Sequence, residues 1–181
     1  MFTEYNEVIE CRRRNLNIEK LKSLLNLVPL PSEGGCYAET YRSTELIKQE
    51  WLPSRYSGPR NMSTAIYYLL EPNTFSALHR VASDEIFHFY IGDPVEMLQL
   101  WPDGSGKLVL IGADIERGMA PQVVVPRGVW QGSRLAEGGK FALLGCTVSP
   151  GFEFADYENG SRHVLSQAYP EFRHFICALT R

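Results

Sequence analysis

Two stretches of the chain carry apolar residues at the spacing of an amphipathic helix. Asn17 precedes the first stretch as a helix cap, and Pro29 and Pro31 follow it as helix breakers. The residues that share a face are Ile18, Leu21, Leu25 and Val28 in the first stretch, and Phe172, Phe175, Ile176 and Leu179 in the second. The pattern predicts an N-terminal helix that ends before the prolines, and a short C-terminal helix that packs on the outside of the fold.

Between these helices the chain alternates apolar and polar residues, as β-strands do. Gly34 and Gly35 form a turn into an extended segment. The strand-like runs that follow cover residues 63–70, 75–81, 85–92, 95–102, 106–112, 121–128, 129–135 and 140–150. Turn sequences such as EPN, GDP and EGG separate many of them, which predicts an all-β sandwich or barrel.

Length and charge agree with one folded domain. The chain has 181 residues, 44% hydrophobic and 22% charged, with a net charge of −3. This charge gives no basic surface for nucleic acid or anionic membranes. We expect a polar N-terminal arm over residues 1–16, containing the basic run CRRRN, and one domain over residues 17–181 with its barrel core at about 35–158.

Targeting and redox signals are sparse. The four cysteines, at positions 11, 36, 146 and 177, are too far apart for a zinc ribbon or a disulfide framework. The first ten residues lack the basic and apolar regions of a signal peptide, and no run approaches the roughly 20 apolar residues of a membrane span. The sequence therefore predicts a cytoplasmic protein.

The stretch LHRVASDEIFHFYIG, residues 78–92, concentrates the candidate chemistry. Residues that alternate with Glu85 on one strand face are Phe87, Phe89 and Ile91. His79 lies on the preceding strand. If a hairpin joins the two strands, His79 and Glu85 converge on the interior of the barrel, either as a structural pair or as the polar part of a ligand site.

The opposite face of the same strand carries Ile86, His88 and Tyr90. We therefore expect His88 to pack between sheets or at an interface rather than to take part in chemistry. Apolar side chains of this size on an outer face favour association, so the pattern predicts a homodimer.

These residues resemble the first motif of the cupin superfamily, which places a glutamate three or four residues after H-x-H and a glycine six residues later. His79, Glu85 and Gly92 fit this spacing, while Val81 stands where the second histidine is expected. The second motif, P-x-G followed by a histidine, is similar to PRGVWQ, in which Gln131 replaces the histidine.

Longer blocks resemble the Cupin-5 branch, a group of largely unassigned function. They are, in order, PSEGGCYAETYRS, STAIYYLL, FSALHRVASDEIFHFYIGDP, PQVVVPRGVWQGSRL and GCTVSPGFEFADYENG, and they cover most of residues 27–170. The resemblance implies a double-stranded β-helix, the cupin jelly-roll barrel, with the N-terminal and short C-terminal helices added.

Of the four metal ligands that the resemblance implies, the chain keeps His79 and Glu85, with Gln131 as a weak oxygen donor. A facial metal site requires two histidines and a carboxylate. We therefore expect no metal and no other cofactor, and if a divalent metal does bind, these three residues hold it. The side chains expected to bind a ligand are Phe87, Phe89, Gln131, Tyr68, Trp130 and Ser133, although Tyr68 and Trp130 could instead pack outside the pocket.

Three functions remain open. The first is a metal-independent enzyme, similar to an isomerase or epimerase, acting on a carbohydrate-type or other small polar metabolite, with His79 as general base oriented by Glu85. The second is a non-catalytic module that binds a ligand in an aromatic-lined barrel. The third is a metal-dependent oxygenase or isomerase, which Val81 opposes.

Downstream, the alternation of Phe152 and Phe154 predicts a strand that seals the barrel. Asp156 and Glu158 are expected to be solvated charges.

Overall fold

The computed structural model describes residues 17–181, and the expected arm over residues 1–16 lies outside the described residues. Helix α2 (Ile18–Leu25) begins as predicted, because the Asn17 side chain accepts a hydrogen bond from the Lys20 amide at 2.9 Å. It ends earlier than predicted. Asn26 adopts the left-handed conformation with φ 53° and closes the helix, so Val28 belongs to a strand instead of the helix face.

Each of the eight predicted runs contains a strand. The strands are β1 (Val28–Pro29), β2 (Cys36–Arg42), β3 (Leu46–Ile47), β4 (Arg60–Asn61), β5 (Thr64–Leu70), β6 (Phe75–Arg80), β7 (Asp84–Gly92), β8 (Val95–Leu100), β9 (Gly106–Ile111), β10 (Gln122–Val125), β11 (Trp130–Leu135), β12 (Ala142–Ser149) and β13 (Glu158–Asn159). The remaining helices are η1 (Gln49–Trp51), η2 (Ile115–Arg117), η3 (Phe154–Asp156), α3 (Arg162–Ala168), η4 (Pro170–Phe172) and α4 (Arg173–Ala178).

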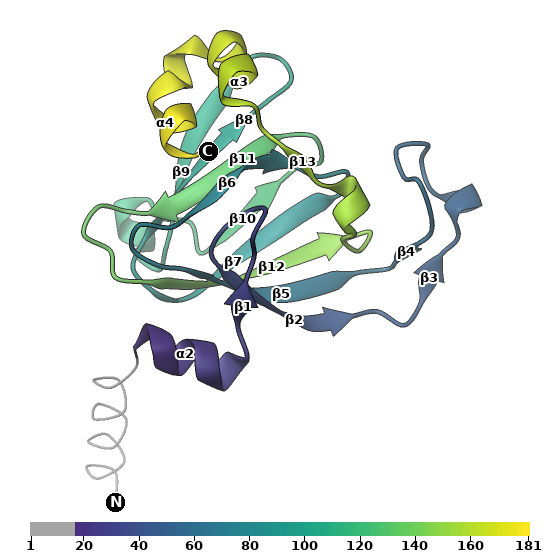
Figure 1. The fold of residues 1–181 in the computed structure, drawn as a ribbon, viewed down its shortest axis with the longest axis horizontal. Coiled ribbons are helices and arrows are strands. Elements are labelled where there is room, and N and C mark those ends of the chain that lie inside the picture. Colours follow the sequence, from purple (N-terminus) through teal and green to yellow (C-terminus); the bar gives the residue numbers. More distant parts are fainter. Residues whose placement is uncertain (1–16) are drawn as a thin grey trace, which may run out of the picture.

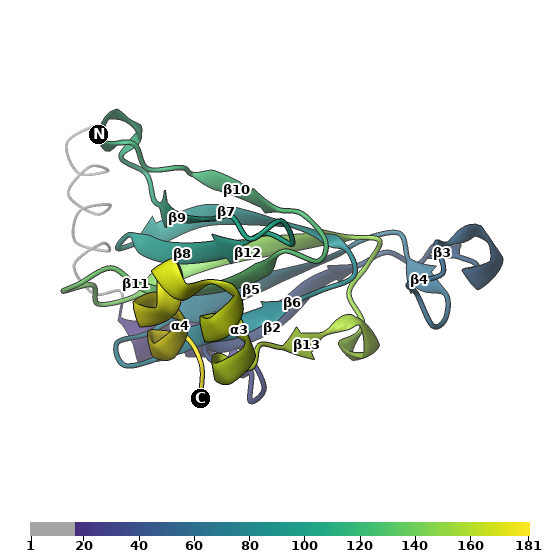
Figure 2. The same ribbon diagram turned by 90° about the horizontal axis from the view of Figure 1, so that it is seen from above.

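Two antiparallel sheets face each other and enclose the main core (Figures 1 and 2). One sheet has the order β1-β2-β5-β12-β7-β10 and the other β13-β6-β11-β8-β9. Side chains from both sheets meet in this core, among them Tyr68, Phe87, Met97 and Leu144. The hairpin of β3 and β4 projects away from the sheets (Figure 2).

The predicted hairpin between β6 and β7 is wrong. β6 pairs with β11 and β13, whereas β7 pairs with β12 and β10 in the opposite sheet. The connection through Ala82 and Ser83 therefore crosses from one sheet to the other, and β6 and β7 present residues to each other across the barrel interior. His79 and Glu85 still converge, although by a different route from the one expected.

Helices cover the outer faces of the sheets. The segments α3 and α4 lie over the five-stranded sheet (Figure 1), where Leu165, Ile176 and Leu179 pack against Leu78 and Leu98. The predicted outer C-terminal helix is thus confirmed as α4, and α3 precedes it. None of the helices between residues 17 and 181 is long and apolar enough to cross a membrane.

A β-bulge changes the predicted alternation near the end of β7. Pairing with β12 shifts between Leu143 and Leu144, so that Ile91 lies opposite Leu143 and Phe89 opposite Leu144. Ile91 therefore leaves the face of Glu85 and is 39% exposed, contrary to the predicted period-2 pattern. Tyr90 is exposed, as the parity predicts, and its ring meets that of Tyr67 edge-on.

Candidate functional site

His79 and Glu85 are joined through Gln131 inside the barrel. The Gln131 Nε2 atom lies 2.7 Å from His79 Nε2 and 3.2 Å from Glu85 Oε2, and donates to both. The other imidazole nitrogen, Nδ1, lies 2.7 Å from the Ala77 carbonyl oxygen and donates to it. The predicted direct contact, in which Glu85 orients His79, is therefore replaced by a backbone carbonyl on one side of the ring and an amide on the other.

Glu33, in the loop between β1 and β2, reaches the same cluster. Its Oε1 atom accepts a hydrogen bond from Ser76 Oγ at 2.7 Å, and its Oε2 atom lies 3.9 Å from His79 Nε2. The main chain holds the loop, because the Ala77 amide donates to the Glu33 carbonyl at 2.8 Å. The ring of Tyr157 stacks on His79, with centroids 4.9 Å apart. The imidazole is enclosed on several sides and is 1% exposed.

Glu85 is a buried carboxyl group with weak support for its charge. Burial is the main cause that raises its pKa from 4.5 to about 7, and the nearby Glu33 carboxylate adds to the rise. The nearby His79 imidazole has the largest effect in the opposite direction, and the hydrogen bond from Gln131 and a 3.7 Å contact from the Cys146 thiol also lower the pKa. At neutral pH this carboxyl group can therefore either donate or accept a proton.

Glu85 lines a cavity of about 60 Å³ at the mouth of the barrel. On the same measure one water needs roughly 10–15 Å³, so the space suits about four to six non-hydrogen atoms. The lining residues are Leu30, Ser32, Glu33, Glu39, Thr64, Ile66, Glu85, Cys146, Val148, Phe152, Phe154 and Tyr157. Of the two predicted catalytic residues, only Glu85 is in this lining.

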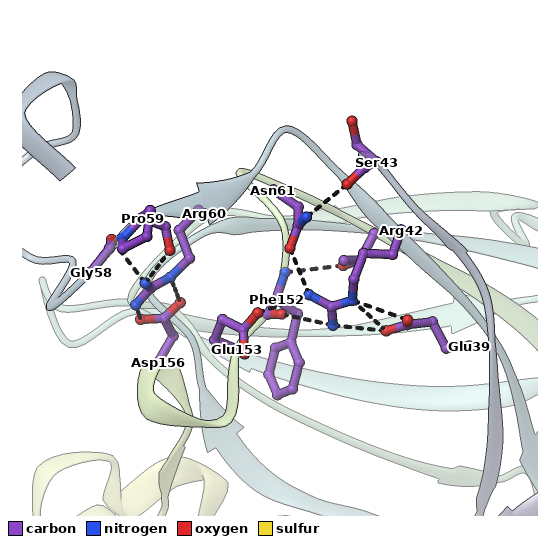
Figure 3. A network of polar contacts seen from close by, with 11 residues as sticks. Glu39, Arg42, Ser43, Gly58, Pro59, Arg60, Asn61, Phe152, Glu153 and Asp156 are labelled. Atoms are coloured by element: carbon purple, nitrogen blue, oxygen red, sulfur yellow. Dashed lines mark hydrogen bonds and ion pairs between the residues drawn. The ribbon is translucent and has the colours of Figure 1, made fainter. Parts of the chain in front are cut away.

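Residues 152–157, which we call the mouth segment, form one wall of the cavity and are clamped by two arginines (Figure 3). Arg42 donates to Glu153 at 2.8 Å, and Arg60 forms a bidentate pair with Asp156 at 2.7 and 2.5 Å. The Asp156 side chain is 3% exposed, so its predicted solvation is wrong. Glu158 is exposed, as expected. The predicted sealing strand is also wrong, since Phe154 begins the short helix η3.

The residues predicted to bind a ligand occupy several different places. Phe87 and Tyr68 are buried in the main core, with Phe89 packed against it, and the Tyr68 hydroxyl donates to the Gly34 carbonyl at 2.9 Å. Ser133 is fully buried and its hydroxyl has no hydrogen-bond partner among the described residues. Trp130 is the clearest correction, because it packs with the outer helices and under Arg80 rather than inside the barrel.

The comparisons with known proteins agree with this architecture. Residues 19–159 match the Cupin_5 family, described as cupin superfamily (DUF985). The chain belongs to this family. An uncharacterised protein of Saccharomyces cerevisiae is 32% identical over 152 residues, which cover 80% of this chain and 73% of the yeast protein.

Two solved structures are similar to this chain over most of its length. A hypothetical protein from Leishmania major is 31% identical, with a TM-score of 0.81 over 91% of this chain and 99% of that one. A protein from Shewanella oneidensis is 33% identical, with a TM-score of 0.79 over 92% and 98%. The predicted cupin β-barrel jelly roll is confirmed.

The residues at the cupin metal position fit a metal poorly. Val81 is buried and has no ligand atom, and Gln131 turns its nitrogen, not its oxygen, towards His79 and Glu85. The described residues contain no group of three or more histidines, cysteines or acids placed to hold a metal ion. The His79–Gln131–Glu85 cluster is organised as a hydrogen-bonded chain instead.

Sequence reasoning missed Glu33, Cys146 and Tyr157. Cys146 alternates with Leu144 and Val148 on β12, so strand parity offered a signal for its inward position. Nothing local marks Glu33 or Tyr157, since each reaches His79 from a segment far away in the sequence.

Proposed function

We propose that this cupin binds a small polar metabolite at the barrel mouth and exchanges a proton with it through Glu85, without a metal. The observation that carries the proposal is the position of Glu85, which lines the cavity and has its pKa raised by burial to about 7. A carboxyl group poised near neutral pH is suited to general acid–base catalysis. A carbohydrate derivative remains within the class of metabolite that fits this role.

In this proposal His79 and Gln131 position Glu85. Gln131 is fully buried and donates to the carboxylate, while His79 accepts the second amide hydrogen of the same nitrogen. His79 is thereby fixed between Ala77 and Gln131, with its ring covered by Tyr157. The sequence predicted that His79 exchanges the proton with the ligand. We assign this role to Glu85, because Glu85 reaches the cavity.

The experiment begins with a thermal-shift screen of a metabolite library on the wild type. The metabolite that stabilises it most is then incubated with the protein in D₂O, and NMR follows exchange of its carbon-bound hydrogens. We expect Glu85→Gln to slow exchange by a factor of about 10² to 10⁴. Glu116→Gln, which removes an exposed carboxylate from η2, is the matched control and should exchange at the wild-type rate. Exchange at the wild-type rate in Glu85→Gln would exclude this carboxyl group as the catalyst.

A second candidate is ligand binding without catalysis, favoured by the aromatic wall of Phe152, Phe154 and Tyr157. The same experiment separates the two functions. Binding that Phe154→Ala weakens, with no hydrogen exchange in the wild type, identifies a binding protein.

A further inference from the structure

The lining of the mouth cavity is acidic and lacks a basic side chain. It contains Glu33, Glu39 and Glu85, but neither a lysine nor an arginine. Arg42 compensates Glu39, with three contacts of 2.8 to 3.2 Å between the guanidinium and the carboxylate. No lysine or arginine of residues 17–181 lies within ion-pair distance of Glu33 or Glu85. The His79 Nε2 atom lies 3.9 Å from Glu33 Oε2, but it accepts a hydrogen from Gln131, so the two acids that face the cavity lack a lysine or arginine partner.

The cluster behind these acids offers acceptors and few donors. Gln131 donates both hydrogens of its Nε2 atom, one to His79 and one to Glu85. Its Oε1 atom is buried and has no hydrogen-bond partner among the described residues. His79 Nε2 is an acceptor as well, because it receives one of those hydrogens. A buried acceptor without a donor is costly. Neither Gln131 nor His79 lines the cavity, so the acceptors that a ligand meets directly there are the carboxylates of Glu33 and Glu85.

The walls of the cavity suit an organic cation better than a hydrated metal ion. Phe152, Phe154 and Tyr157 present aromatic rings, and Leu30, Ile66 and Val148 present aliphatic groups. Aromatic faces attract ammonium groups, while apolar walls favour a ligand that has a hydrocarbon part. The cavity of about 60 Å³ limits the enclosed part of the ligand to a few non-hydrogen atoms.

We propose that the ligand of the mouth cavity is a small primary ammonium compound whose charged nitrogen lies between Glu33 and Glu85 and whose apolar part contacts the mouth segment. An ammonium group supplies three donors, which match the two carboxylates and leave one for a neighbouring acceptor. The inference rests on the proposed function, in so far as both place the ligand at the barrel mouth. It goes further by naming the charge of the ligand, and it disfavours phosphorylated and other anionic metabolites.

The test uses three probes of nearly equal size, namely butylamine, butan-1-ol and butyrate. Each is titrated into ¹⁵N-labelled protein at constant pH and ionic strength, and the amide signals of residues 33, 85 and 152–157 report binding at the mouth. We expect butylamine to bind at least tenfold more tightly than either other probe. Glu33→Gln should weaken butylamine binding at least tenfold, since glutamine keeps the acceptor for Ser76 but removes the charge. Glu116→Gln should leave the affinity unchanged.

Two results would overturn the inference. If butan-1-ol or butyrate moves the mouth signals with an affinity equal to that of butylamine, the ligand site stands but its preference for a cation is lost. If butylamine leaves those signals unmoved at tens of millimolar while the metabolite screen finds a mouth ligand, the ammonium assignment fails and the proposed function survives. A screen that finds no mouth ligand, together with a clear butylamine response, would support the site chemistry and count against proton exchange.

Discussion

Replacing Glu85 by glutamine should abolish the pH dependence that this one carboxyl group imposes on stability. Glutamine has nearly the same shape and keeps an oxygen that can accept from Gln131 Nε2, so the hydrogen-bonded cluster survives. It removes the charge that burial penalises. The variant therefore isolates the electrostatic cost of an ionised Glu85.

The magnitude follows from the pKa. In the folded protein it is raised from 4.5 to about 7, so the folded state holds the proton more tightly than the unfolded chain does. Below pH 4.5 the group is protonated in both states and contributes no penalty. As the pH rises from there to 7, the unfolded chain loses the proton first, and the free energy of unfolding falls by up to about 1.4 kcal/mol per pH unit. The total penalty above pH 7 is roughly 3 kcal/mol.

The assay is urea unfolding of the wild type and Glu85→Gln at pH 5 and pH 8, followed by tryptophan fluorescence. Taking the difference between the two proteins cancels the titration of other groups. We expect the stability of the variant relative to the wild type to increase by roughly 2 to 3 kcal/mol between these pH values. Glu116→Gln should show no such change. A relative stability of Glu85→Gln that is equal at pH 5 and pH 8 would refute the raised pKa and, with it, the role of Glu85 as a proton-exchanging group.

Three further predictions concern the clamp, the metal and the assembly. Asp156→Asn should lower the free energy of unfolding by about 3 to 5 kcal/mol in urea titrations, because it leaves the buried Arg60 without its counter-charge. The control, Glu158→Gln, breaks a more exposed pair and should lower the free energy of unfolding by less than about 1 kcal/mol. Equal losses in the two variants would contradict this account. Elemental analysis of purified protein should find no stoichiometric transition metal, whereas one equivalent that disappears in His79→Ala would restore the metal-dependent hypothesis. Light scattering of the wild type should give twice the 20.5 kDa chain mass. Tyr90→Glu, on the exposed sheet face, should lower the measured mass. A monomer mass for the wild type at micromolar concentration would exclude the dimer.

Local patterns predicted the strands well because the information is local. Turn residues bound each run, and the alternation of β7 correctly placed Glu85 and Phe87 inside and His88 on the other face. The same alternation failed at Ile91, because one extra residue in a bulge inverts every later position. Sequence gives no warning of such a bulge when the strand lacks an internal glycine.

Contacts between distant segments were the part that the sequence could not supply. A short connection between β6 and β7 is compatible with a hairpin or with a crossing between sheets, and only the pairing of both strands with other partners decides between them. The burial of Asp156 depends on Arg60, 96 residues earlier in the chain. Glu33 likewise joins the site only because its loop docks on β6.

The departures from the cupin motif give a physical reason for the raised pKa of Glu85. In the family pattern the glutamate shares its site with histidines that bind a cation, and a divalent ion would keep a buried carboxylate ionised. Here Val81 and Gln131 stand at two of those ligand positions, so the carboxylate is desolvated, and His79, the Gln131 amide and the Cys146 thiol only partly offset the cost of its charge. The pKa of Glu85 rises to about 7 as a direct consequence. An ammonium ligand between Glu33 and Glu85, as proposed above, would supply the positive charge that a metal ion supplies in the family pattern.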